Sequence, residues 1–143
     1  MPSCSPELAA FGARLHAFLG NGLINRKWWT HGGCWKLASA LHQYLGDDRT
    51  ELWGVGDPLA GIAYHVSVRI GDCFIDADGA SSEQELLARW RKIYPGRVLI
   101  VRKLTRFEVE HFSCEESFHT DEMYDRFENE FGPSEVLWRS IFS

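Results

Sequence analysis

Two β-rich runs separated by only two residues constrain the fold of this chain more than any other feature. Residues 63–70 and 73–77 are rich in β-branched and aromatic side chains, and Gly71-Asp72 lies between them. A glycine-containing pair between two such runs is typical of a two-residue hairpin turn. The sequence therefore predicts an antiparallel β-hairpin.

The length of this turn fixes which side chains face each other across the hairpin. With a two-residue turn, Ser67 lies opposite Asp76 and His65 lies opposite Asp78. Cross-strand partners project to the same face, because side chains alternate along a strand with period two. One face of the hairpin is thus predicted to carry an imidazole with one carboxylate directly across from it and another placed diagonally.

Patterns on both sides of the hairpin indicate the fold class. The predicted helices cover residues 8–19, 34–45, 83–93 and 120–131, and further strands are predicted at residues 51–55 and 98–101. A Ser82-x-x-Glu85 capping box opens the third helix. Helices at the ends with hairpin-linked strands between them favour an α+β fold. We expect a single domain over residues 1–143, with N-terminal helices packed on a small antiparallel sheet and an acidic helical segment at about residues 107–143.

Size and charge exclude several classes of protein. The 143 residues carry a net charge of −5, and residues 107–143 hold ten of the 20 acidic residues but only two of the 15 basic ones. A nucleic-acid-binding domain is normally basic or shows a clear basic stripe. No apolar run approaches the roughly 20 residues of a membrane-spanning helix, and the first residues lack the pattern of a signal peptide. We therefore expect a cytoplasmic protein without nucleic-acid or membrane partners.

The four cysteines are widely spaced, at Cys4, Cys34, Cys73 and Cys114. No two of them have the short spacing of zinc or redox motifs. Because cytosolic thiols stay reduced, we expect four unpaired thiols. Since short Cys spacings are absent, we also expect no bound metal, and we expect no cofactor. The question is then whether one of these thiols is a catalytic group.

Cys34 has the most suggestive surroundings, in the tetrad Gly32-Gly33-Cys34-Trp35. A thiol at a helix start lies at the positive end of the helix dipole, near unpaired N–H donors. Such a position favours the thiolate, and the same N–H groups can hold a developing oxyanion. The alternative is that Cys34 is a small buried apolar residue, as many cysteines are.

The hairpin supplies the partners that a thiol nucleophile needs. A carboxylate bonded to one imidazole nitrogen fixes the tautomer and supports the imidazolium, which leaves the other nitrogen to take the thiol proton. Taken singly, His65 could be an ordinary strand histidine, and Asp76 and Asp78 a turn-forming pair. Because all three residues follow a cysteine at a helix start, their combination favours a Cys-His-Asp triad.

The runs G-G-C-W-K-L-A-x-A-L and H-V-S-V-R-I-G-D-C-F-I-D-A-D-G resemble the core of the papain-like and transglutaminase-like cysteine enzyme superfamily. The resemblance covers about residues 28–80. It implies a helix with a cysteine at its head, packed on an antiparallel sheet that bears the histidine and the aspartate. It also implies that Cys34 is the nucleophile, His65 the base and then the acid, and Asp76 the orienting carboxylate. Papain relatives have an oxyanion-hole glutamine shortly before the cysteine, and this chain has none there.

The sequence also offers possible neighbours of the catalytic site and a competing metal site. Possible neighbours of the site are Asp78, Gly33, Trp35, His31 and Trp29. A competing metal site would use His111, Cys114 and His119, but no second Cys/His pair completes a structural zinc site.

The function predicted from the sequence is a cysteine hydrolase or acyltransferase that acts on an amide or acyl group through a Cys34 thioester. Peptidase, deamidase and transglutaminase-like chemistry all remain open. The expected substrate is a protein or peptide, or a small acyl or amide compound. The alternative is a catalytically inactive protein-interaction module with the same fold.

Overall fold

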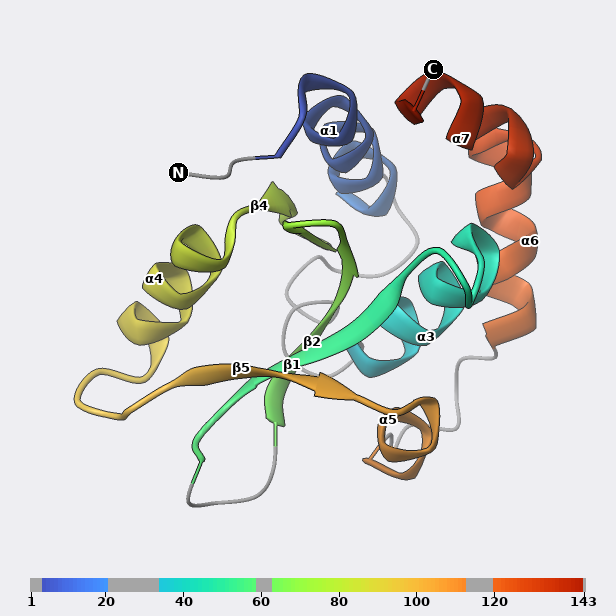
Figure 1. Ribbon diagram of the computed structural model, residues 1–143. Coiled ribbons are helices and arrows are strands. Elements are labelled where there is room, and N and C mark those ends of the chain that lie inside the picture. The colour runs from blue at the N-terminus through green and yellow to red at the C-terminus, as the bar shows by residue number, and fades with distance from the viewer. Residues whose placement is uncertain (1–3, 21–33, 59–62, 113–119, 143) are drawn as a thin grey trace.

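A five-stranded antiparallel sheet forms the centre of the structure, a computed structural model shown in Figure 1. The structure describes residues 4–20, 34–58, 63–112 and 120–142. The strands are β1 (Glu51–Gly56), β2 (Ala63–Ile70), β3 (Cys73–Asp76), β4 (Gly79–Ser81) and β5 (Ile100–Leu104), in the spatial order β4-β3-β2-β1-β5. The helices are α1 (Pro6–Gly20), α3 (Cys34–Leu45), α4 (Glu83–Ile93), α5 (Arg106–Phe112), α6 (Thr120–Phe131) and α7 (Ser134–Phe142).

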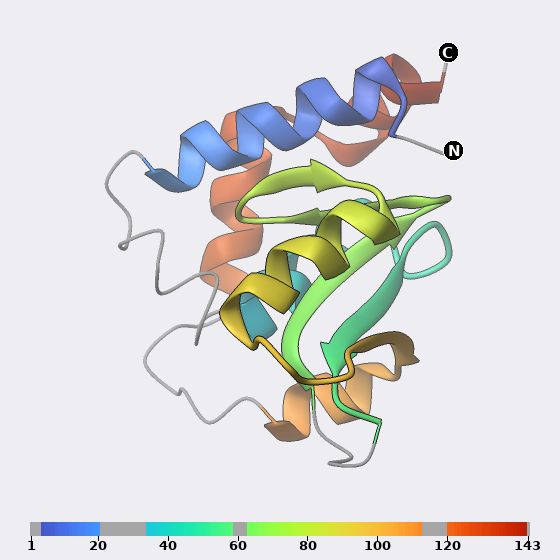
Figure 2. The same ribbon diagram turned by 90° about the vertical axis from the view of Figure 1, so that its left-hand side faces the viewer.

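Helices pack on both faces of the sheet, as Figures 1 and 2 show. On one face, Val66, Val68 and Ile75 belong to a large apolar core that they share with α1, α3, α6 and α7. On the other face, Leu86 and Trp90 of α4 pack in a second, smaller core with residues of β1 and β3. The predicted α+β fold with an antiparallel sheet is therefore confirmed.

The hairpin has the predicted turn and register. In the β2–β3 pair, Ile70 lies opposite Cys73 and Val68 lies opposite Ile75. The Ser82–Glu85 capping box at the start of α4 is also present, with both of its hydrogen bonds. The sequence patterns did not predict β4, α5 or α7, and β5 begins two residues later than expected.

A disulfide joins Cys4 to Cys73, so the expectation of four unpaired thiols was wrong for these two residues. α1 packs on β3 and β4, which brings Cys4, two residues before the helix, beside Cys73, the first residue of β3. Their Cα atoms are 5.0 Å apart, within the usual range for a disulfide. Because 69 residues separate the two cysteines, their spacing gave no hint of the bond.

The contact between α1 and β4 is close because α1 carries a glycine there. A Cβ atom at Gly12 would lie 2.4 Å from the backbone nitrogen of Ala80 and 2.8 Å from its Cβ. Real Cβ atoms do not approach backbone this closely, so the helix would have to move away from the strand. Gly12 thus sets the distance between α1 and the sheet.

Gly12→Ala is expected to destabilise the protein by about 1–3 kcal/mol, the usual cost of overpacking a core. This cost outweighs the gain of roughly 1 kcal/mol that alanine brings to a helix interior. Gly20→Ala is the matched control, since a Cβ atom at Gly20 meets nothing within 4 Å. Urea unfolding measures both variants, and equal stabilities would contradict the close packing of α1 on β4.

The acidic C-terminal segment is part of the main core. Met123 and Phe127 of α6 are fully buried, as their helical spacing predicts. The hydroxyl of Tyr44 donates to the carbonyl of Gly132 at 2.6 Å, and the indole N–H of Trp138 donates to the carbonyl of Leu45 at 2.6 Å. These bonds join α3 to the end of α6 and to α7. The acidic side chains of α6 and α7 whose burial is described lie on the exposed faces of these helices, whereas the inner faces hold the fold together; these side chains are Glu122, Asp125, Glu128, Glu130 and Glu135.

The end of α3 contains a buried histidine that makes stability depend on pH. The ring Nδ1 of His42 is hydrogen-bonded to the hydroxyl of Thr50, which in turn donates to the carbonyl of Gly46. Burial lowers the pKa of His42, and the nearby charge of Arg106 lowers it further, against an opposing effect of Asp47. The neutral imidazole is therefore the form that the folded chain favours.

Because the unfolded chain binds this proton more readily, the stability that His42 contributes is present above pH about 6.5. It is lost as the pH falls below that value toward the pKa of the folded state. In His42→Asn, an amide N–H can still reach the Thr50 hydroxyl but cannot titrate. Urea unfolding between pH 8 and 5 should show a shallower loss of stability in this variant, and parallel pH profiles would exclude His42 as the source.

No helix of the described residues is long and apolar enough to cross a membrane.

Candidate active site

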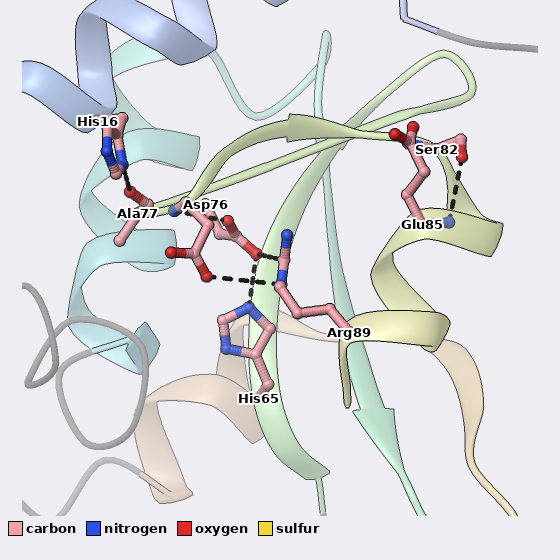
Figure 3. Close-up of polar contacts among 8 residues, drawn as sticks. His16, His65, Asp76, Ala77, Ser82, Glu85 and Arg89 are labelled. Carbon is pink, nitrogen blue, oxygen red and sulfur yellow. Dashed lines mark hydrogen bonds and ion pairs between the residues drawn. The ribbon is translucent and has the colours of Figure 1, made fainter. Parts of the chain in front are cut away.

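A buried, hydrogen-bonded histidine–aspartate pair lies where the β2–β3 hairpin meets α4. His65 is the third residue of β2, Asp76 is the last residue of β3, and their exposed fractions are 0% and 2%. His65 Nε2 lies 2.8 Å from Asp76 Oδ2. Figure 3 shows the ring and the carboxylate pointing toward each other on one side of the hairpin.

The partner of His65 is Asp76 and not Asp78. Extending the hairpin register placed Asp78 directly across from His65, but β3 ends at Asp76, and Asp76 already pairs with Gly79 of β4. Asp78 lies in the turn between these strands, where its backbone N–H donates to Asp76 Oδ1 at 2.9 Å. Asp76, which is placed diagonally from His65, thus makes the hydrogen bond to the imidazole. It is also the aspartate that the family resemblance favours.

An irregularity in β2 positions His65. In the β1–β2 ladder Val55 pairs with His65 but Gly56 pairs with Ala63, so Tyr64 is an extra residue. Such bulges redirect side chains and are frequent next to functional sites. Here the side chains of two successive residues face α4. Tyr64 stacks on Tyr94, the C-cap residue of α4, and His65 stacks on Trp90 with ring centroids 4.7 Å apart.

Arg89 of α4 is a further member of the site that the sequence did not reveal. Its Nη2 donates to Asp76 Oδ2 at 2.8 Å, the same oxygen that faces His65, and its Nε lies 3.5 Å from Asp78 Oδ2. Its position between Leu86 and Trp90, both buried in the structure, is the signal that could have assigned it to the inner side of the helix.

The surroundings of Asp76 favour its charged form. Burial by itself raises the pKa of this carboxyl, but the hydrogen bond from His65, the positive charge of Arg89 and the N–H of Asp78 together hold the pKa below its usual value. An ionised carboxylate can only accept hydrogen bonds. The ring nitrogen of His65 that faces it, Nε2, must therefore carry a proton, which fixes the orientation and the tautomer of the neutral imidazole.

The other predicted site residues are described only in part. Cys34 is the first residue of α3, as predicted, but its side chain is not described. Gly33, His31 and Trp29 lie outside the described residues. Trp35 is partly buried and packs against the main core.

The predicted metal alternative cannot be located in the same way. Cys114 and His119 lie outside the described residues, and nothing of the side chain of His111 in α5 is described. Within the described part of the chain, no three His, Cys, Asp or Glu side chains are grouped as metal ligands.

Known proteins do not identify the chain: no family model, no curated protein and no solved structure matches it.

Proposed function

We propose that this chain is a thiol-dependent amide hydrolase or acyltransferase in which Cys34, His65 and Asp76 form the catalytic triad. The observation that carries the proposal is the buried His65–Asp76 bond of 2.8 Å on adjacent antiparallel strands. In chain order, this pair follows a helix whose first residue is a cysteine. That combination matches the order and the structural context of papain-like and transglutaminase-like enzymes.

The orientation of His65 supports a role as base. Because Nε2 donates to Asp76, Nδ1 is the nitrogen that would take a proton from the thiol. In Figure 3, Nδ1 points away from Asp76, toward the side of the view on which α3 lies. α3 also packs against β2, the strand that bears His65.

The proposed reaction uses these three groups in turn. His65 takes the proton of the Cys34 thiol, and the sulfur attacks the carbonyl carbon of an amide. Backbone N–H groups at the start of α3 hold the oxyanion. The C–N bond then breaks, His65 gives its proton to the leaving amine, and an acyl thioester remains on Cys34. Water or an amine then attacks the thioester carbonyl while His65 takes the proton of the attacking group. The C–S bond breaks, the acyl product leaves, and His65 returns the proton to the Cys34 thiolate.

The substrate class follows from this chemistry. An amide in a protein, a peptide or a small molecule fits the proposed steps, which require no metal ion and no organic cofactor. Hydrolysis and acyl transfer differ only in whether water or an amine reaches the thioester.

The cytoplasmic location predicted from the sequence stays a prediction. Stable disulfides are rare in the cytosol and common in oxidising compartments. The Cys4–Cys73 bond therefore favours an oxidising compartment over the predicted one.

Alkylation of the oxidised protein by iodoacetamide tests the proposal, because Cys4 and Cys73 are protected by their disulfide. Peptide mass spectrometry then compares Cys34 with Cys114. We expect Cys34 to react much faster, with a pH midpoint well below the ordinary thiol value of about 8.5. His65→Gln should slow the labelling of Cys34 at pH 7 by roughly 100-fold or more.

Cys114→Ser is the matched control and should leave the labelling of Cys34 unchanged. Equally slow labelling of Cys34 and Cys114, unaffected by His65→Gln, would contradict the triad. The remaining interpretation would then be the inactive interaction module.

A further inference from the structure

Asp76 receives a second strong donor from α4, the helix whose Trp90 also stacks on the His65 ring. We propose that Arg89 is a positioning residue of the active site, which holds the carboxylate of Asp76 charged and correctly turned so that His65 keeps the tautomer of a general base. This inference rests on the proposed function. It assigns a role to a side chain outside the Cys-His-Asp triad.

The geometry gives Arg89 two points of attachment. Nη2 donates a hydrogen bond to Asp76 Oδ2 at 2.8 Å, and Nε lies 3.5 Å from Asp78 Oδ2, which is an ion-pair contact without a hydrogen bond. One planar guanidinium thus spans the two carboxylates of the β3–β4 turn. A lysine has a single charged nitrogen, which cannot offer this fork of donors.

Two donors share one oxygen of Asp76 without competing for the same lone pair. A carboxylate oxygen has two acceptor positions, and Oδ2 uses them for His65 Nε2 and Arg89 Nη2. Oδ1 accepts from the N–H of Asp78. With all three bonds in place the carboxyl group cannot rotate, and one of its oxygens stays aimed at the imidazole.

The charge of Arg89 matters as much as its donors. The side chain of Asp76 is only 1% exposed, whereas that of Arg89 is 30% exposed. A buried carboxylate without a permanent cation becomes neutral, or it keeps a proton on the neighbouring imidazole. In either case the neutral imidazole with its proton on Nε2 is lost. Arg89 balances the carboxylate while its own outer edge stays hydrated.

α4 holds Arg89 in place from both sides. The helix is fixed at its start by the Ser82–Glu85 capping box. The next residue along, Trp90, is buried and stacks on His65. Asp76 therefore holds the edge of the imidazole through a hydrogen bond, and Trp90 covers its face. The neighbouring residue of the same helix, Arg89, supplies the cation.

The test compares Arg89→Ala and Arg89→Lys with the intact protein, and Arg91→Ala is the matched control because Arg91 is an exposed arginine of the same helix. The first measurement is the rate of Cys34 alkylation at pH 7. We expect it to fall roughly 10- to 100-fold in Arg89→Ala, by analogy with the loss of a hydrogen-bond partner behind a metal-binding histidine. The rate for Arg89→Lys should lie between those of Arg89→Ala and the intact protein. The rate for Arg91→Ala should equal that of the intact protein.

Two further measurements separate positioning from a merely structural role. Millimolar guanidinium should partly restore labelling in Arg89→Ala, whereas urea, which has the same shape without the charge, should not. Nitrogen-15 NMR of the His65 ring should show a proton on Nε2 in the intact protein and a mixture of forms in Arg89→Ala. If the alanine variant does not fold, Arg89→Lys carries the rate and NMR comparisons.

The outcomes distinguish this inference from the proposed function. Slow, unselective labelling of Cys34 in the intact protein would overturn both. Selective labelling that persists or accelerates in Arg89→Ala and Arg89→Lys would overturn only the role of Arg89. Slower labelling with no rescue by guanidinium and an unchanged His65 tautomer would show that Arg89 serves stability alone.

Discussion

Loss of the Cys4–Cys73 disulfide is expected to lower the free energy of unfolding by about 4 kcal/mol. The bond closes a segment of 69 residues, and in the chain-entropy model a loop of this length lies between the values of about 3 and 4.7 kcal/mol given for 15 and 100 residues. For a domain of this size the melting temperature should fall by roughly 10 °C. Urea unfolding of the protein with and without dithiothreitol measures the effect.

Cys4→Ala combined with Cys73→Ala isolates the disulfide from other effects of the reductant. The double variant should be about as unstable as the reduced protein and should not respond further to dithiothreitol. Cys114→Ser should keep the full response. A double variant as stable as the oxidised protein would show that the disulfide adds nothing to the stability of the fold.

Asp76→Ala is expected to destabilise the protein by about 3 kcal/mol, the lower end of the range for removing one partner of a buried ion pair. The change leaves His65 buried without its acceptor, while Arg89, which is partly exposed, can recover some hydration. Asp78→Ala is the matched control. It removes a carboxylate 3.5 Å from the same guanidinium but 18% exposed, so it should cost under about 1 kcal/mol.

The pH dependence gives this prediction a second measurement. The folded state holds the pKa of Asp76 below its usual value, so its stabilising effect is present above pH about 4 and is lost as the pH falls through the pKa of the folded state. Asp76→Asn should lack this acid-induced loss. Equal costs for Asp76→Ala and Asp78→Ala, or unchanged acid sensitivity in Asp76→Asn, would contradict the central place of Asp76 in the network.

The hairpin register could be predicted because it depends on neighbouring residues alone. A two-residue turn at Gly71-Asp72 sets the pairs that follow, and the observed pairs agree. The same rule failed two residues beyond the end of β3. It assumed that the strand continues to Asp78, whereas the chain already turns there to form β4. Local rules thus predicted the face of the sheet but not the end of the strand, which depends on pairing with a later segment.

The disulfide and Arg89 could not be predicted for a different reason. Both depend on where a helix lies relative to the sheet, which the periodicity of the helix does not specify. Periodicity indicates that Leu86 and Trp90 face inward, but not that the β3–β4 turn near this helix bears two carboxylates that Arg89 contacts. In the same way, the distance between Cys4 and Cys73 is set by the packing of α1 on β3.

The packing of α1 also has a consequence for the order in which the chain is made. Phe11 and Phe18 of this first helix make edge and tilted ring contacts with Phe127 and Phe131 of α6. These partners leave the ribosome more than a hundred residues later, at a synthesis rate of about 5–20 residues per second. During synthesis, the apolar side of α1 therefore remains without its contacts to α6 for several seconds. A chaperone that binds exposed apolar helices would find a target in α1 before α6 has been synthesised.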